Sequence, residues 1–99
     1  MIINYKEYGK CKVEIGRYGN HQKAIQLIGT EGEYNGSVIT VPTVSMDICI
    51  EDNEVIIKDY SENEGAYSIL LAEGVISKAK RKVQIGYGTG CVCELLVDE

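Results

Sequence analysis

The feature that most constrains the fold of this chain is the strict alternation of apolar and polar residues in "CKVEIGR" (11–17). Cys11, Val13 and Ile15 fall on one side of this segment, and a period of two predicts a half-buried β-strand. The polar stretch "YGN" (18–20) then predicts a turn, and "KAIQLIG" predicts the returning strand. The first third of the chain is therefore expected to form an antiparallel hairpin.

The same patterns of alternation and turn residues predict further strands in the rest of the chain. "SVITVPT" predicts a further strand, in which Pro42 indicates a sheet edge or a strand end. "MDICI" (46–50) and "EVIIKD" (54–59) are predicted to pair as a hairpin around "EDN". "RKVQIG" and "CVCELLV" are predicted to pair around the glycine-rich stretch near the C-terminus.

One segment has helical spacing. Ser61 and Glu64 match a capping box, in which each residue caps a main-chain N–H of the first turn. A stripe of residues at helical spacing follows (Ala66, Ile69, Leu70, Glu73), and Gly74 is a natural stop. We predict one principal helix at about residues 62–73. The expected fold class is α+β: an antiparallel, curved β-sheet of about six to eight short strands with this helix across it or at its edge.

A chain of 99 residues predicts a single domain, residues 1–99. A chain of this size buries roughly 60–65% of its unfolded surface, so a second copy would add stability, and we expect a homo-oligomer, a dimer or higher. No apolar run approaches the ~20 residues that cross a bilayer, and the start of the chain does not resemble a signal peptide. We therefore expect no membrane partner and a place in the cytoplasm of a host bacterium.

The four cysteines are interpreted as thiols (Cys11, Cys49, Cys91, Cys93). Disulfides are not expected in a reducing compartment. Cys91 and Cys93 lack the two-residue gap of zinc knuckles, and His21 is the single histidine. On a strand both thiols share a face with Leu95, which predicts that they are reduced and buried in the core. We predict no metal and no cofactor.

The net charge of −5 is unevenly distributed along the chain. Residues 31–73 carry −9, residues 1–30 carry +3 and residues 74–99 carry +1. Binding of duplex DNA is disfavoured, because it depends on a basic face that neutralises many phosphates. A small anion bound by the basic ends of the chain remains compatible with this pattern.

The stretch "SKAKRKVQIGYGTGC" (77–91) places a basic cluster beside a tyrosine held between glycines. Such glycines allow main-chain N–H groups to converge on an anion, but a hairpin with several glycines is also common without a ligand. The stretch lacks the "GK[ST]" ending of a loop that hydrolyses nucleotides. Both interpretations, anion site and plain hairpin, stay open on the sequence alone.

The candidate ligand-binding residues come from two turns of the same polar and aromatic kind: Arg17, Tyr18, Asn20, His21, Lys80, Arg81, Lys82 and Tyr87. Lys80, Arg81 and Lys82 would neutralise phosphates, Tyr18 and Tyr87 would stack on bases, and Asn20 would read a base edge. All seven aromatic residues are tyrosines, which suits half-buried sites, interfaces and stacking pockets, or the decoration of surface hairpins. No catalytic residue is predicted, because His21 fits an exposed turn better than a general base.

The series "YGNHQKAIQLIG", "VIIKDYSENEG", "LLAEGVI" and "GYGTGCVCELLV" resembles an uncharacterised family of short bacterial proteins, a domain of unknown function. Its members recur in phages, plasmids and other mobile elements, and the resemblance extends from Tyr5 to Val97. It implies no activity and no cofactor. It implies a setting among small accessory proteins of elements that must survive bacterial defence.

Three functions follow as hypotheses. The first is a non-enzymatic anti-defence protein that sequesters a small nucleotide immune signal, either a cyclic oligonucleotide or an ADP-ribose derivative, in a pocket between chains. The second is a protein-binding inhibitor of a defence effector such as a CRISPR complex, with the acidic middle of the chain acting as a nucleic-acid mimic. The third is a small hydrolase of nucleotide signals.

Overall fold

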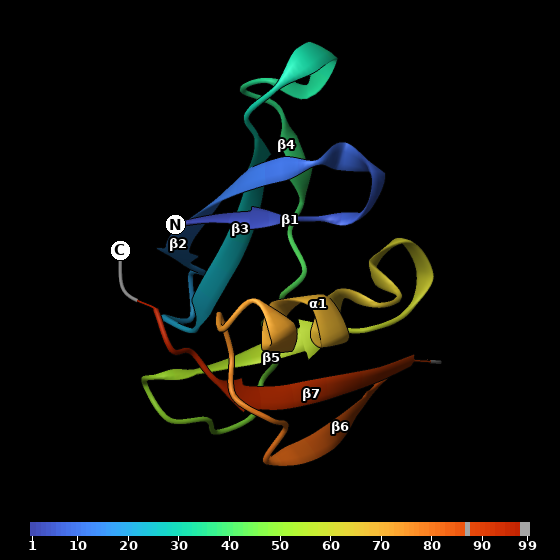
Figure 1. Ribbon diagram of the computed structural model, residues 1–99. Coiled ribbons are helices and arrows are strands. Elements are labelled where there is room, and N and C mark those ends of the chain that lie inside the picture. The colour runs from blue at the N-terminus through green and yellow to red at the C-terminus, as the bar shows by residue number, and fades with distance from the viewer. Residues whose placement is uncertain (87, 98–99) are drawn as a thin grey trace.

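The computed structural model describes residues 1–86 and 88–97, and its strands divide between two antiparallel sheets (Figure 1). The first sheet has the order β1-β2-β3-β4, with β1 at Ile2–Asn4, β2 at Lys10–Arg17, β3 at Lys23–Gly29 and β4 at Val38–Thr40. The second sheet has the order β5-β7-β6, with β5 at Glu54–Lys58, β6 at Arg81–Ile85 and β7 at Gly88–Glu94. The predicted α+β class, the antiparallel pairing and the number of strands are confirmed.

The alternation in β2 produces the pairing that the sequence predicts. Val13 lies opposite Leu27 and Ile15 lies opposite Ile25 on β3, so their side chains share the inner face of the first sheet. Burying this face removes apolar surface from water, which is the main favourable term in folding. The hairpin predicted for the first third of the chain is confirmed.

The two sheets enclose the core together with α1 (Ala66–Ala72), which lies between them in Figure 1. The core draws on all three elements (Ile3, Tyr5, Cys11, Val13, Ile25, Leu27, Val55, Ile57, Ala66, Leu70, Val75, Ile76, Cys91, Cys93, Leu95). The predicted burial of Cys91 and Cys93 is confirmed, and burial raises the pKa of the Cys93 thiol to about 12. None of the helices in the described part of the chain is long and apolar enough to cross a membrane.

The α-helix lies within the predicted range of 62–73, but it begins only at Ala66 and its cap is a different residue. A 3₁₀ turn at Ser61–Asn63 precedes α1, and Ser61 has a φ of 58° with no capping hydrogen bond from its side chain. Asp59 caps the helix instead: its Oδ1 accepts hydrogen bonds from the N–H of Gly65 at 3.0 Å and of Tyr67 at 3.2 Å. The capping box is therefore wrong, because the turn removes Ser61 from the position next to α1.

The strand predicted at residues 46–50 is also wrong. Residues 45–53, here called the bridging segment, have no regular secondary structure and connect the first sheet to β5. Just before this segment the chain runs along the edge of the second sheet, where Val44 N–H donates to the Ile56 carbonyl at 3.0 Å. That edge is therefore already paired, and the hydrogen bonds of the bridging segment come mainly from side chains of other elements.

Thr43 joins the two sheets. Its main chain forms a bridge with Ile57 of the second sheet, while its Oγ1 accepts a hydrogen bond from the Ile25 N–H of the first sheet at 3.1 Å. The Tyr18 hydroxyl lies 3.1 Å from both the Oγ1 and the carbonyl oxygen of Thr43. Thr43 is 2% exposed, so water has little access to replace these bonds.

We expect Thr43→Val to destabilise the fold by about 1–3 kcal/mol, because the buried Ile25 N–H would lose its acceptor while the side-chain volume stays similar. Urea unfolding followed by circular dichroism measures this change. Thr30→Val is the matched control, because the Thr30 hydroxyl also forms a hydrogen bond with the main chain, here as donor to the Lys10 carbonyl, but at an exposed position. An equal effect of the two substitutions would contradict the role of Thr43.

Candidate functional site

The glycine-rich stretch near the C-terminus is explained by packing. Gly86 has a φ of 57°, which suits glycine at a turn, and Gly88 and Gly90 already belong to β7. A Cβ atom on Gly88 would lie 2.5 Å from Cδ1 of the Tyr60 ring, and one on Gly90 would lie 2.5 Å from Cδ1 of Ile85. The glycines leave room for these side chains, so the plain-hairpin interpretation accounts for them without an anion. Tyr87 lies outside the described residues, and its stacking role stays a prediction.

The basic cluster lies at β6, which is the edge strand of the second sheet. Lys80 Nζ pairs with Glu54 Oε2 at 3.0 Å, and Arg81 Nη2 donates to the Cys49 carbonyl at 2.8 Å. Glu54 is buried, and its pKa is lowered first by the hydrogen bond from the Glu51 N–H and then by Lys80. Two of the three predicted phosphate ligands therefore hold the fold together, whereas Lys82 is exposed and makes no side-chain hydrogen bond among the described residues.

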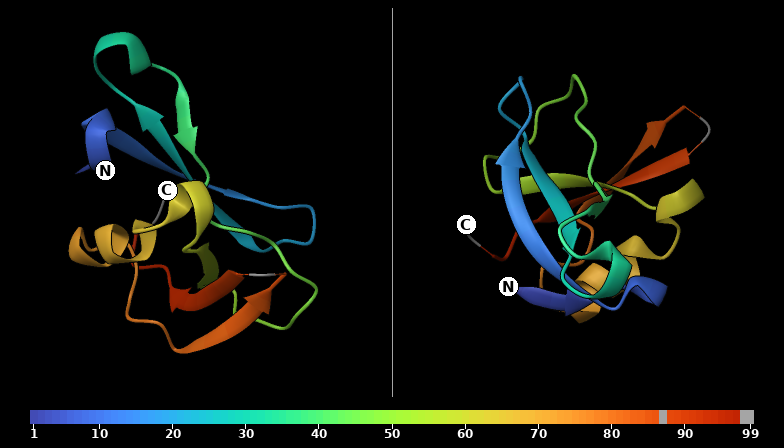
Figure 2. Two further views of the ribbon diagram at one scale, coloured as in Figure 1. Left: turned by 90° about the vertical axis from the view of Figure 1, so that its right-hand side faces the viewer. Right: turned by 90° about the horizontal axis from the view of Figure 1, so that it is seen from above.

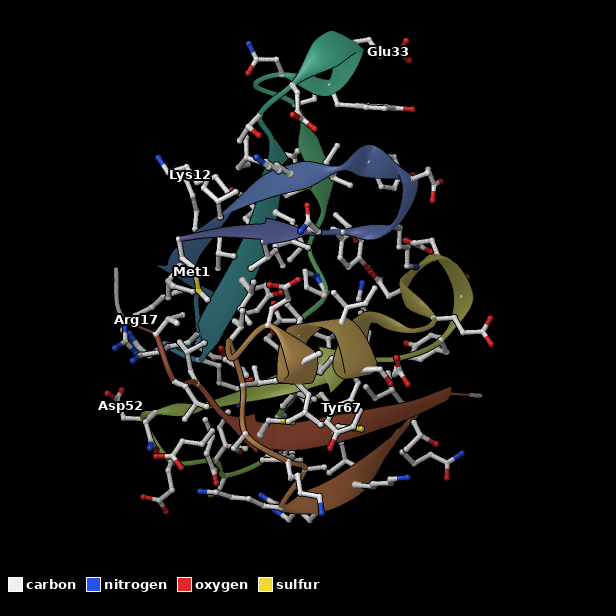
Figure 3. The ribbon with its side chains drawn as sticks, viewed as in Figure 1. Met1, Lys12, Arg17, Glu33, Asp52 and Tyr67 are labelled. Atoms are coloured by element: carbon white, nitrogen blue, oxygen red, sulfur yellow. The ribbon has the colours of Figure 1, made fainter. Side chains whose placement is uncertain are left out.

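The other predicted group lies at the turn between β2 and β3, here called the hairpin tip (residues 18–22) with Arg17 at its base. Arg17 Nη1 donates to the His21 carbonyl at 2.7 Å and to Asp52 Oδ1 at 3.1 Å, and this bond lowers the pKa of Asp52 (Figure 3). Asn20 Nδ2 donates to the Met46 carbonyl at 3.4 Å. The tip is thus tied to the bridging segment.

Gln22 forms more hydrogen bonds with the bridging segment than any other residue of the hairpin tip, and the sequence analysis missed it. Its Nε2 donates to the carbonyls of Met46 at 2.8 Å and Ile48 at 3.1 Å, and its Oε1 accepts from the Met46 N–H at 3.0 Å. One amide side chain therefore supplies the main-chain hydrogen bonds that a neighbouring strand would otherwise supply. Its only signal in the sequence is its place beside a polar turn.

Both predicted groups meet at the bridging segment, although they lie far apart in the sequence. The hairpin tip reaches the segment through Asn20 and Gln22, and β6 reaches it through Arg81. Between the tip and the segment lies a hollow of about 300 Å³. It is lined by Asn20, His21, Gln22, Ile48, Cys49, Ile50, Glu51 and Asp52. This volume is at the lower end for small-molecule sites and corresponds to one small group such as a base.

The fold separates the four predicted residues of the first turn. Asn20 and His21 line the hollow beside the bridging segment, whereas Arg17 and Tyr18 line a second hollow of about 290 Å³ at the end of the first sheet. The Tyr18 hydroxyl donates a hydrogen bond to the Thr43 carbonyl, and this bond fixes the position of the Tyr18 ring. Among the described residues, no group of three or more metal-ligating side chains is placed to hold a metal ion.

Other tyrosines also have structural roles. Tyr5 is buried in the core, and burial raises its pKa to about 12. Tyr8 and Tyr34 pack edge to face, with ring centroids 5.0 Å apart. The Tyr67 hydroxyl accepts a hydrogen bond from the Ala79 N–H at 2.9 Å. The abundance of tyrosine therefore reflects packing and hydroxyl bonds at these positions more than a surface for base stacking.

No family model, curated protein or solved structure matches this chain.

Because Tyr60 covers Gly88, we expect Gly88→Ala to destabilise the fold by about 1–3 kcal/mol through overpacking. The matched control is Gly16→Ala, since a Cβ atom there meets no atom within 4 Å and should leave the free energy of unfolding equal or slightly higher. Urea unfolding compares the two variants. If Gly88→Ala leaves the free energy of unfolding unchanged, packing does not explain this glycine, and an anion site at the glycine-rich stretch is again a possible explanation.

Proposed function

We propose that this protein is a non-enzymatic binding protein of a phage or mobile element that sequesters a small nucleotide immune signal, either a cyclic oligonucleotide or an ADP-ribose derivative. The observation that supports this proposal is the meeting of the two predicted polar groups at the bridging segment. Two basic regions that flank one small hollow suit a ligand that carries both a base and phosphates.

The base would occupy the hollow beside the bridging segment. Asn20 is exposed, and its Nδ2 bond to the Met46 carbonyl is long at 3.4 Å, so this group is available to a base edge, while its Oδ1 accepts from the Gln22 N–H at 3.2 Å. His21 lines the same hollow, and its exposed ring can stack on the base or donate to it. Ile48 and Ile50 supply the apolar part of the lining.

The phosphates would be neutralised from both sides. Arg17 and Asp52 form an exposed ion pair, which stabilises a fold only weakly, so the guanidinium can exchange this carboxylate for a phosphate at little cost. Lys82 is exposed on β6, but it pairs with Cys91 and therefore lies on the face of the sheet opposite Arg81, away from the hollow. The Arg81 side chain already contacts the bridging segment through its hydrogen bond to the Cys49 carbonyl. It would add positive charge beside the phosphates and keep this hydrogen bond.

Binding without catalysis fits the hollow better than hydrolysis. A general base must be oriented toward the proton that it abstracts. His21 is the single histidine, and no described carboxylate forms a hydrogen bond that fixes its ring. The nucleic-acid mimic also gains little support, because Glu33 and Asp52, two residues of the acidic middle of the chain, lie far apart in Figure 3.

The proposal predicts that a panel of cyclic di- and trinucleotides and ADP-ribose derivatives contains a compound that raises the melting temperature and binds in calorimetry. Arg17→Ala should weaken that binding about tenfold, because a hydrogen bond to a charged group contributes ~1.5–3 kcal/mol. The variant should keep most of its stability, since the ion pair of Arg17 with Asp52 is exposed. Lys10→Ala, an exposed lysine on β2, is the matched control.

Chromatography of the released ligand distinguishes the hypotheses. An unaltered compound supports sequestration, whereas a cleaved one supports the hydrolase. If no compound in the panel binds, or if Arg17→Ala binds as tightly as the unmodified protein, the proposed site is wrong.

A further inference from the structure

Arg17 lies between two hollows of nearly equal size. The first hollow is the one of about 300 Å³ beside the bridging segment, and the second hollow is the one of about 290 Å³ at the end of the first sheet. Arg17 lines the second hollow, while its Nη1 donates to the His21 carbonyl at 2.7 Å and to Asp52 Oδ1 at 3.1 Å (Figure 3). His21 and Asp52 both line the first hollow. The two hollows are therefore neighbours, and one guanidinium group lies at their boundary.

The second hollow has a low floor and a fixed aromatic wall. Gly16 lies opposite Ala24 on β2 and β3, and a Cβ atom on Gly16 would meet no atom within 4 Å. These small residues leave the main chain open to a flat ring. Tyr18 lines the same hollow, and the bond from its hydroxyl to the Thr43 carbonyl at 3.1 Å fixes its position. An aromatic side chain held in this way is suited to stacking on a base.

Both hollows carry carboxylates, and positive charge lies between them. Glu14 lines the second hollow, and Glu51 and Asp52 line the first. Among the described residues, Arg17 is the only lysine or arginine that lines either hollow, and Lys23 lies opposite Arg17 at the same end of the hairpin. Carboxylates repel a phosphate, whereas two neighbouring cations attract it. The charges therefore favour an uncharged group in each hollow and an anionic group at the boundary.

We propose that the nucleotide is a cyclic dinucleotide, which places one base in each hollow and its two phosphates against Arg17 and Lys23 between them. This inference rests on the proposed function and narrows its ligand class. A cyclic dinucleotide has two bases joined through two phosphates, so its uncharged and charged groups follow the order that the two hollows and their boundary require. ADP-ribose would place a sugar in one hollow, and a sugar offers no aromatic face to Tyr18.

One edge of the second hollow also selects among bases. Glu14 lies opposite Gln26, and both residues line this hollow. The ion pair between Glu14 Oε2 and Lys12 Nζ, at 3.1 Å, is exposed, and a carboxylate has room to accept further hydrogen bonds. Carboxylates accept from the exocyclic amino group of a base, as they do from cytosine. The second hollow should therefore prefer a base that carries an amino group, and uracil carries none.

Calorimetry with cyclic di-AMP, cyclic di-GMP, cyclic di-UMP and ADP-ribose tests the inference. The tighter of the first two compounds should bind at least tenfold more tightly than cyclic di-UMP and ADP-ribose. Gly16→Leu places a side chain in the open space of the second hollow and should weaken that binding tenfold or more. Gly19→Leu is the matched control, because a Cβ atom there also meets no atom within 4 Å and Gly19 lines neither hollow. Circular dichroism verifies that both variants are folded.

The outcomes separate this inference from the proposed function. If ADP-ribose or cyclic di-UMP binds as tightly as the other compounds, or if Gly16→Leu leaves the affinity unchanged, the inference is wrong. The proposed function then still stands, provided that Arg17→Ala weakens the binding that is observed. If none of the compounds binds, the inference fails together with the proposed function.

Discussion

The hydrogen bonds of Thr43 determine how the two halves of this molecule fit together. Without them the two sheets would be joined mainly by apolar packing, which is strong but non-directional, and by a few other hydrogen bonds such as that from the Val44 N–H to the Ile56 carbonyl. Thr43 fixes the crossing point, because its side chain bonds to β3 and its main chain pairs with β5. The bridging segment begins directly after this junction, so its path past the hairpin tip and toward β6 follows from where Thr43 is held (Figure 2).

Local patterns in the sequence predicted the elements that local rules govern. Alternation predicted β2 and β3, and helical spacing placed α1, because these periods reflect burial of one face. The capping box failed because Ser61 adopts a positive φ and Asp59 takes over the cap. The strand at 46–50 failed because hydrogen bonds from Gln22 and Arg81, which are distant in sequence, determine the path of that segment.

The candidate site illustrates the same limit. The sequence predicts ligand-binding residues in the basic cluster and the polar turn, but residue type alone does not separate a side chain that binds a ligand from one that stabilises the fold. Lys80 neutralises the buried Glu54, and lysines on an edge strand also discourage unwanted pairing with other chains. Gly88 and Gly90 were candidates for an anion site until Tyr60 and Ile85 proved to pack on them. Arg17, Asn20 and His21 remain as the side chains best placed for a ligand.

The central claim is that one small site lies between the hairpin tip, the bridging segment and β6. Titration of the ¹⁵N-labelled protein with a nucleotide, followed by NMR chemical shifts of the amides, tests this claim most directly. The account predicts that large shifts fall on residues 20–22, 48–52 and 81–82, with little change at Ile2, Ile28 and Val38 at the far end of the first sheet. Shifts centred on those three residues, or spread evenly over the molecule, would contradict it.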